Sequence, residues 1–311
     1  MKKQLWRILE FFDPPIKGTD ITFKEVKLNT PEGVDEIIRK DWEKQLLAKQ
    51  EDLAKLGRAT NIKPYHLDSS DKPLQALYEG EKAVMWPGQV ITLVGVNKKN
   101  NKVSLDVGET SFPFINGLKN PEITKLYEKA GIQKPIPAMA ISTLAITSDN
   151  YIVMTLRGPA TNMYPGRIYG QGGNPTSTKT KVVEHQIEEM EDEILVTKKD
   201  YNPRDFMFGG ICIDEELLPG KPDLIGWIPI KLDSKTLEQR VKSRDIKSRP
   251  SDAVDIVFIP NNDKDLFKVL TDKEACKKFN PPGYASLFVY GRAIFGKPWA
   301  EKVMKTIGKA G

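Results

Sequence analysis

Two adjoining stretches of the chain are the most informative: Gly170-Gln171-Gly172-Gly173-Asn174-Pro175, and then Glu188-Glu189-Met190-Glu191-Asp192-Glu193-Ile194-Leu195-Val196. The spacing around the second stretch predicts a helix over about residues 177–196. Its apolar residues recur at steps of three and four and form one stripe, which needs a core to cover it. The stripe consists of Val183, Ile187, Met190 and Ile194.

The predicted helix also carries a row of acidic side chains. Glu189 and Glu193 are four residues apart, so their carboxylates stack one turn above the other, with Asp192 beside them and His185 one turn earlier. Like charges at this spacing weaken a helix by a few tenths of a kcal/mol. A divalent cation such as Mg²⁺ offsets that repulsion and takes carboxylate and phosphate oxygens as ligands. We therefore expect both glutamates on an open face of the helix; a solvated acidic surface is the alternative.

Two features favour a site over a solvated surface. Gly172 and Gly173 come directly before the helix, and glycine lets the backbone approach a ligand closely. The acidic residues are concentrated in the C-terminal half of the helix, where the helix dipole disfavours negative charge. A local cost of this kind is typical of functional sites.

The rest of the chain alternates predicted strands and helices, which indicates an α/β or α+β fold. Pro135 and Pro137 bound the predicted junction between residues 1–135 and residues 136–311. Residues 1–30 are expected to be an irregular or extended lead-in. The predicted helices cover about 33–56, 120–133, 233–243, 264–279 and 297–308; hairpins cover 88–106 and 138–156; further strands cover 206–213, 224–230 and 254–259.

Composition excludes several classes of protein. The chain has 311 residues, of which 39% are hydrophobic and 29% charged, and no apolar run approaches the ~20 residues of a spanning helix. The N-terminus lacks the pattern of a secretory signal, and only two cysteines are present, so we expect a reducing cytoplasm. The net charge of +5 permits an anionic ligand and disfavours a DNA-binding function.

The glycine loop and acidic helix resemble the signature of the Nudix hydrolases, which ends in R-E-U-x-E-E-x-G-U, where U is aliphatic. Glu189, Met190, Glu193 and Val196 match this pattern, and Asp192 replaces the first glutamate of the E-E pair. Three positions depart from it. Glu188 stands at the arginine, Leu195 at the glycine, and Lys179 or Thr180 at the isolated upstream glutamate.

One branch of that family departs in a similar way. The eukaryotic Nudix enzymes that hydrolyse UDP-glucose and UDP-galactose have a G-G-x-P loop and an E-x-x-D-E core, which Gly172–Pro175 and Glu189–Glu193 resemble. The segment from Leu105 to Phe112, followed by Asn116-Gly117, is similar to a segment that this branch carries before its Nudix core.

The resemblance implies a fold and an activity. The expected fold is an α/β/α sandwich around a mixed sheet in residues 136–311, with C-terminal helices. Residues 1–135 would form an N-terminal α+β extension or small domain. The expected activity is Mg²⁺-dependent hydrolysis of a nucleoside diphosphate linked to another group, with a nucleotide sugar favoured, releasing a nucleoside monophosphate. Mn²⁺ is the alternative metal, and the resemblance also allows a homodimer.

The resemblance assigns roles to particular residues. Glu189 and Glu193 would bind the metal, with Asp192 as a further ligand or water-orienting group. The substrate would be bound by the arginines Arg157 and Arg167, which suit a diphosphate, by the backbone of Gly172 and Gly173, and by Tyr164, which would stack on a base.

Two other functions remain open at this stage. The departures from the signature allow a nucleotide-binding module that does not hydrolyse its ligand, and metal-dependent turnover separates the two. An RNA-associated or scaffold protein is the third reading, and it rests on a set of basic residues. This set is Lys198, Lys199, Arg240, Lys242, Arg244, Lys247 and Arg249.

Overall fold

A mixed β-sheet lies at the centre of the computed structural model, which describes residues 5–55, 60–64, 74–78, 82–85, 88–135, 137–158, 163–217, 219–244 and 253–310. Eight described strands form it: β1 (Trp6–Lys17), β8 (Ala140–Ile146), β9 (Tyr151–Arg157), β10 (Ile168–Tyr169), β11 (Gln171–Gly173), β12 (Met207–Asp214), β13 (Lys221–Pro229) and β14 (Ala253–Pro260).

The pairing of β8 positions the glycine loop. β8 runs parallel to β13, and the other pairs of this sheet are antiparallel, so the sheet is mixed as predicted. Residues 141–143 of β8 pair with β11, whereas Ala145 and Ile146 pair with β9. The strand is thus shared between two partners on one side, and the glycines of β11 lie beside the middle of the sheet.

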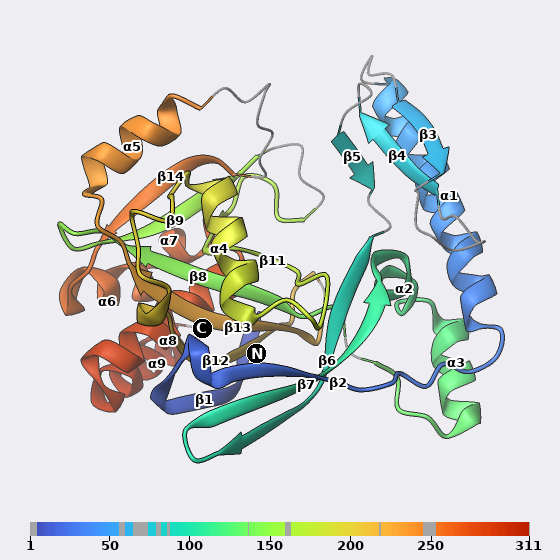
Figure 1. Ribbon diagram of the computed structural model, residues 1–311, viewed down its shortest axis with the longest axis horizontal. Helices are drawn as coiled ribbons and strands as arrows, with labels where there is room; N and C mark the ends of the chain where they lie inside the picture. Colours follow the sequence, from blue (N-terminus) through green and yellow to red (C-terminus); the bar gives the residue numbers. More distant parts are fainter. Residues whose placement is uncertain are drawn as a thin grey trace.

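Helices cover both faces of this sheet (Figure 1). On one face α4 (Val182–Glu193) and α5 (Ser234–Lys242) share a core with the strands; on the other, α6 (Asp263–Thr271), α8 (Pro281–Phe295) and α9 (Lys297–Ala310) form a second core. Alternate residues of one strand enter different cores: Ile141 and Ala145 face α4, and Leu144 and Ile146 face α8. The predicted α/β/α sandwich is confirmed.

The N-terminal half adds two smaller sheets and a helical cluster. β2 (Ile21–Glu25), β7 (Lys102–Ser111) and β6 (Gln89–Lys99) form one sheet, and β3 (Thr60–Pro64), β4 (Leu74–Tyr78) and β5 (Lys82–Met85) form the other. Helices α1 (Val34–Lys55), α2 (Phe112–Gly117) and α3 (Pro121–Ala130) pack around their own apolar cluster. The division at residues 135 and 136 stays a prediction.

Residues 6–17, which were predicted as part of an irregular or extended lead-in, form the strand β1. β1 pairs with β12 at one side of the central sheet, so residues 6–17 belong to the same sheet as the C-terminal strands. The ladder breaks between Phe11 and Ile16, where Pro14 and Pro15 lie. Proline has no N–H to donate to a ladder and is confined to edges and bulges of sheets. Those prolines hid the strand from a sequence-based reading.

Other elements follow the predictions with local differences. The hairpin turn is Asn100-Asn101, both with positive φ, so β6 and β7 are longer than expected. The predicted helix 264–279 is two helices, α6 and α7 (Lys273–Cys276), because the Asp272 carboxylate caps a new start. Short 3₁₀ helices cover Gly18–Asp20 and Pro203–Asp205, and α8 was not predicted. Among the described residues, no helix has the length and apolarity needed to cross a membrane.

Candidate functional site

The glycine loop fits against α4 and β8 with no room for side chains. A Cβ on Gly172 would lie 1.9 Å from the backbone oxygen of Ile141, and a Cβ on Gly173 would lie 2.3 Å from Oε1 of Glu189. Real Cβ atoms do not approach other atoms so closely. The obstacle at Gly172 is backbone, so only glycine fits there, whereas the obstacle at Gly173 is the end of the Glu189 side chain. The two glycines bring the backbone of β11 directly onto the carboxylates of α4.

Glu193 is buried beneath this loop and is only 5% exposed. Its Oε1 accepts a hydrogen bond of 2.5 Å from the hydroxyl of Tyr169, and its Oε2 accepts one of 3.0 Å from the N–H of Gly172. Burial, and then the nearby charge of Glu189, raise the pKa of Glu193 well above its ordinary value. The expectation that Glu193 lies on an open helix face is wrong, because β11 and Tyr169 cover it.

Glu189 lies one turn before Glu193 and is more accessible, with 30% of its side chain exposed. Its Oε1 is 3.7 Å from Nε2 of His185, which lies a further turn toward the N-terminus. The His185 ring is buried and also bonds to the backbone of Gly173, and burial lowers the pKa of His185 to about 4. The predicted row of His185, Glu189 and Glu193 therefore faces the glycine loop as one continuous strip.

Asp192 does not share that strip. Its side chain is exposed, as is that of Glu188, which stands at the arginine of the Nudix signature. Within the ranges that the structure covers, no three His, Cys, Asp or Glu side chains gather closely enough to hold a metal ion by themselves. Glu189 is half-buried and both oxygens of Glu193 accept hydrogen bonds, so a metal held by these two carboxylates would need its remaining ligands from phosphate or water.

The C-terminal end of α4 keeps a glycine-like backbone without a glycine. Leu195 has φ of 57°, the left-handed conformation that the signature glycine would adopt easily and that costs another residue roughly 1–2 kcal/mol. Arginines stabilise this end. Arg240 Nη1 donates to the Leu195 carbonyl at 3.0 Å, and Arg244 Nη2 donates to the carbonyls of Asp192 at 2.8 Å and Glu193 at 2.5 Å.

These contacts bear on the RNA-associated reading. Arg240 also pairs with Asp200, Lys242 pairs with Glu238, and Arg244 bonds to carbonyl oxygens, so these basic groups serve contacts within the chain. Lys198 and Lys199 are exposed, and Lys247 and Arg249 lie outside the described residues. Arg240 and Arg244 act here as a cap on α4, and an RNA-associated function stays a prediction.

Arg157 lies close to the buried carboxylate. Its guanidinium carbon is 4.7 Å from the centre of the Tyr169 ring, and Tyr169 bonds to Glu193. The positive charge of Arg157 opposes the effect of burial on the pKa of Glu193. Of the two predicted arginines, Arg157 is the one beside the acidic strip.

Arg167 and Tyr164 belong to a neighbouring polar network. Both terminal nitrogens of Arg167 donate to Glu216, at 2.9 and 3.0 Å, and the buried Tyr164 hydroxyl donates to Asp214 at 2.7 Å. Burial and then Asp214 raise the pKa of Tyr164. In this conformation the Tyr164 ring is not available for stacking on a base, and the carboxylates of Asp214 and Glu216 are engaged.

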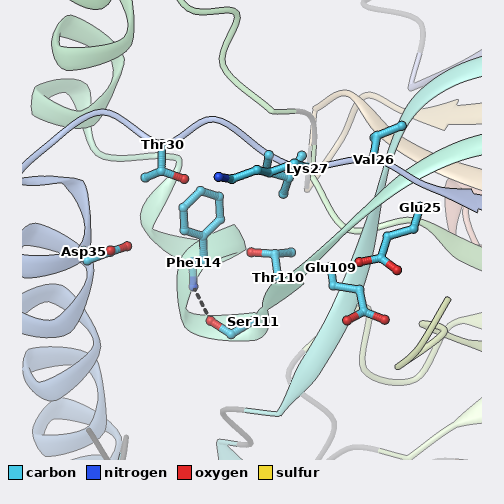
Figure 2. A pocket seen from close by; sticks show the side chains of 10 residues that line it. Glu25, Val26, Lys27, Thr30, Asp35, Glu109, Thr110, Ser111 and Phe114 are labelled. Atoms are coloured by element: carbon cyan, nitrogen blue, oxygen red, sulfur yellow. Dashed lines mark hydrogen bonds between the residues drawn. The ribbon is translucent and has the colours of Figure 1, made fainter. Parts of the chain in front are cut away.

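A cavity of about 750 Å³ lies beside the loop that joins β11 to α4. Figure 2 shows Glu25 and Glu109 at one end of it, Asp35 at the other, and the Phe114 ring between them. Glu109 accepts hydrogen bonds from the N–H and the hydroxyl of Thr178, at 3.0 and 2.9 Å, which anchors that loop to β7. Lys27 and the hydroxyls of Thr30, Thr110 and Ser111 complete the polar part of the lining.

Two features of this region were not predicted from the sequence. The hydrogen bond of Tyr169 to Glu193 was not predicted, although Tyr169 stands directly before the glycine loop. The cavity was missed because its walls come from β2, α1, β7 and α2, which are distant in sequence. The segment around Gly108-Glu109-Thr110 was the one available signal for it.

Comparison with known proteins gives only distant structural likenesses. No protein-family model matches the chain, and no curated protein matches its sequence. A bifunctional NMN adenylyltransferase/ADP-ribose pyrophosphatase from Francisella tularensis, complexed with AMP and a Mn ion, is similar at 12% identity and a TM-score of 0.33, over 59% of this chain and 49% of that one. A second structure of that protein is similar at 13% identity and a TM-score of 0.30, over 56% of this chain and 46% of that one.

DR0079 from Deinococcus radiodurans is similar at 11% identity and a TM-score of 0.32, over 49% of this chain and 80% of that one. The matches to the two Francisella tularensis structures span about half the length of those chains. At these TM-scores the likenesses support no inference about activity, which has to come from the site itself.

Proposed function

We propose that this chain is a Mg²⁺-dependent pyrophosphohydrolase of the Nudix type, which cleaves a nucleoside diphosphate linked to a sugar and releases a nucleoside monophosphate. One observation carries the proposal. Glu189 and Glu193 lie one turn apart on α4 and face a backbone loop that two glycines bring into contact with them. A helix that only packs in a core needs neither paired carboxylates nor a backbone segment in contact with them.

The two carboxylates fit a divalent cation. Burial and the charge of Glu189 both disfavour the ionised form of Glu193, and a bound cation would relieve both effects. Mg²⁺ usually takes one or two carboxylates and completes its shell with water and substrate phosphates. When bound, the metal would neutralise charge on the phosphates and lower the pKa of bound water. Asp192, on the exposed side, would act only after a rotation of its side chain.

The residues beside the strip would position the substrate. Arg157 packs on the Tyr169 ring, and its positive charge lowers the pKa of Glu193, so Arg157 is the better candidate for binding a diphosphate. Arg167 is held by Glu216 and would first have to leave that partner. Gly172 and Gly173 would shape the backbone wall of the site.

The lining of the cavity, which comes from residues 25–35 and 109–114, favours a sugar if the second half of the substrate lies there. Glu25, Asp35 and Glu109 outnumber the one lysine of the lining, so the cavity disfavours phosphate. Sugar hydroxyls donate to carboxylates, and an aromatic ring such as Phe114 can pack on the apolar face of a sugar. A dinucleoside polyphosphate, in contrast, would place further negative charge at this end.

A direct assay tests the proposal. The purified chain is incubated with nucleoside diphosphate sugars, ADP-ribose, NADH and dinucleoside polyphosphates, with Mg²⁺ or with EDTA, and release of the nucleoside monophosphate is measured. We expect Mg²⁺-dependent release from nucleotide sugars. Release only from dinucleoside polyphosphates would contradict the sugar assignment.

A second candidate is a nucleotide-binding module without hydrolysis. It is favoured by the hydrogen bonds that engage both oxygens of Glu193 and by the exposure of Asp192. No release from any compound, together with ligand-induced thermal stabilisation, would establish this function in place of the hydrolase.

A further inference from the structure

His185 presents an unusual environment for a buried histidine. Its side chain is 7% exposed, its ring bonds to the Gly173 backbone, and its Nε2 has no hydrogen-bond partner among the residues that the structure describes. Because Nε2 makes no hydrogen bond, the bond to Gly173 comes from Nδ1. The bond favours the charged ring, so the Gly173 carbonyl is its acceptor and Nδ1 carries the hydrogen.

This tautomer leaves a lone pair on Nε2, and that lone pair faces a carboxylate. Nε2 lies 3.7 Å from Oε1 of Glu189. A carboxylate oxygen is also only an acceptor, so two electron-rich atoms face each other in a place that water reaches poorly. A cation between them turns this repulsion into two favourable contacts.

The geometry has the features of a metal-binding histidine. Metal-ligating histidines donate their other ring N–H to a carboxylate or a backbone carbonyl, as Nδ1 of His185 does. His185 and Glu189 are four residues apart on one helix face, a spacing at which two side chains can share one ion. Ligands about 2 Å from one metal lie about 3 Å apart, so a small rotation of the Glu189 side chain closes the gap.

We propose that Nε2 of His185 and the Glu189 carboxylate together bind one divalent transition-metal ion, so that this site accepts Mn²⁺, Co²⁺ or Zn²⁺ as well as the Mg²⁺ of the proposed hydrolysis and binds those ions more tightly. Imidazole suits transition metals, whereas Mg²⁺ takes oxygen ligands. The inference rests on the proposed metal-binding role of Glu189 and not on hydrolysis. It makes His185 a determinant of metal choice at the proposed site.

The experiment uses the full chain with Mn²⁺ and no substrate. Pulsed electron paramagnetic resonance detects coupling of the Mn²⁺ electron spin to a directly bound nitrogen. The chain has two histidines, His66 and His185, which provides a matched control. We expect nitrogen coupling in the wild type and in His66→Gln, and its loss in His185→Gln. We also expect His185→Gln to weaken Mn²⁺ binding at least about 10-fold by calorimetry, with little change for Mg²⁺.

Labelling covers the case in which His185→Gln does not fold. Wild-type protein grown with nitrogen-15 histidine should show an altered coupling pattern, which requires no variant. Absence of nitrogen coupling in the wild type, or its loss in His66→Gln alone, would overturn the inference. Nitrogen coupling without turnover of any substrate would support the metal site and contradict the proposed hydrolase function. Mg²⁺-dependent turnover without nitrogen coupling would support the hydrolase function and contradict the His185 metal site.

Discussion

Helices α4 and α8 pack on opposite faces of one sheet and differ in almost every other respect. α8 is buried on all sides from Pro281 to Gly291, and its neighbours are apolar side chains of the sheet, α6 and α9. α4 buries an apolar stripe that includes Met190, and a second, polar row of His185, Glu189 and Glu193 lies against the glycine loop. α8 completes an apolar core, whereas α4 divides its surface between an apolar core and the polar site.

This difference separates the expected roles of substitutions. Changes in α8 remove apolar contacts and should reduce stability alone, because its buried stretch carries no acid or base next to the proposed site. Changes in the acidic row of α4 should affect metal and substrate more than stability. Each experiment below is designed to break or sharpen this contrast.

The largest effect is expected in α8. Leu287 is fully buried in the core between α8 and the sheet. Leu287→Ala should lower the free energy of unfolding by about 3 kcal/mol, because a cavity replaces the side chain. Urea unfolding measures the loss, and hydrolysis per folded molecule should be unchanged. Reduced hydrolysis per folded molecule would show that the core around α8 on one face of the sheet affects the site on α4 on the other face.

The next effect concerns the half-buried acid of α4. Glu189→Gln should lower kcat/KM for the cleaved nucleotide at least about 100-fold, which corresponds to about 2.7 kcal/mol. Glu188→Gln is the control, since Glu188 is adjacent and exposed. Equal losses in both variants, or no loss in Glu189→Gln, would remove Glu189 from the proposed site.

The ends of the two helices offer a smaller effect. α8 is followed by Gly296, whose φ is 88°, whereas α4 is followed two residues later by Leu195, and Arg244 donates to the last carbonyls of α4. Arg244→Met should reduce the free energy of unfolding by about 1.5 kcal/mol, the typical worth of a hydrogen bond to a charged group. Lys242→Met, which loses one exposed ion pair, should leave the free energy of unfolding nearly unchanged.

The smallest effect is a pH dependence specific to α4. Burial raises the pKa of Glu193, so above the ordinary pKa near 4.5 the unfolded chain releases this proton while the folded chain retains it. Folding then becomes less favourable as the pH rises through that window. In metal-free protein with EDTA, Glu193→Gln should gain stability relative to the wild type between about pH 5 and about pH 7. A constant difference across that range would contradict the buried, proton-retaining state.

Sequence-based reasoning succeeded where side chains follow a period. The helix from Val34, the hairpin of β8 and β9, and α4 were predicted because apolar residues recur at helical or alternating steps. It failed for α8, because a helix that is apolar all round has no such period and this one begins with Pro281-Pro282. It also failed for β1, where two prolines interrupt the strand pattern.

The candidate site was predicted in composition but not in exposure. Glu189, Glu193, Gly172 and Gly173 meet as their order along the chain suggested. Periodicity places a residue on a helix face, but it does not tell what covers that face. Asp192 was expected beside the pair and lies outside, because it directly precedes Glu193 and one residue rotates a helix by about 100°, which carries Asp192 away from the loop that covers Glu193.

The sequence by itself determined the local features of this protein: the glycine pair, the acidic row of α4, and the alternation of strands and helices that leads to a sandwich. Tertiary structure alone decided which of these groups are buried and which partners they have. The hydrogen bond of Tyr169 to Glu193 and the cavity lined by Glu25 and Asp35 join residues that are far apart in the chain. His185 and Glu189 are close in the chain, but another element covers them. The physical reason is that burial and electrostatic environment are set by whatever packs on a side chain, and local periodicity carries no record of that neighbour.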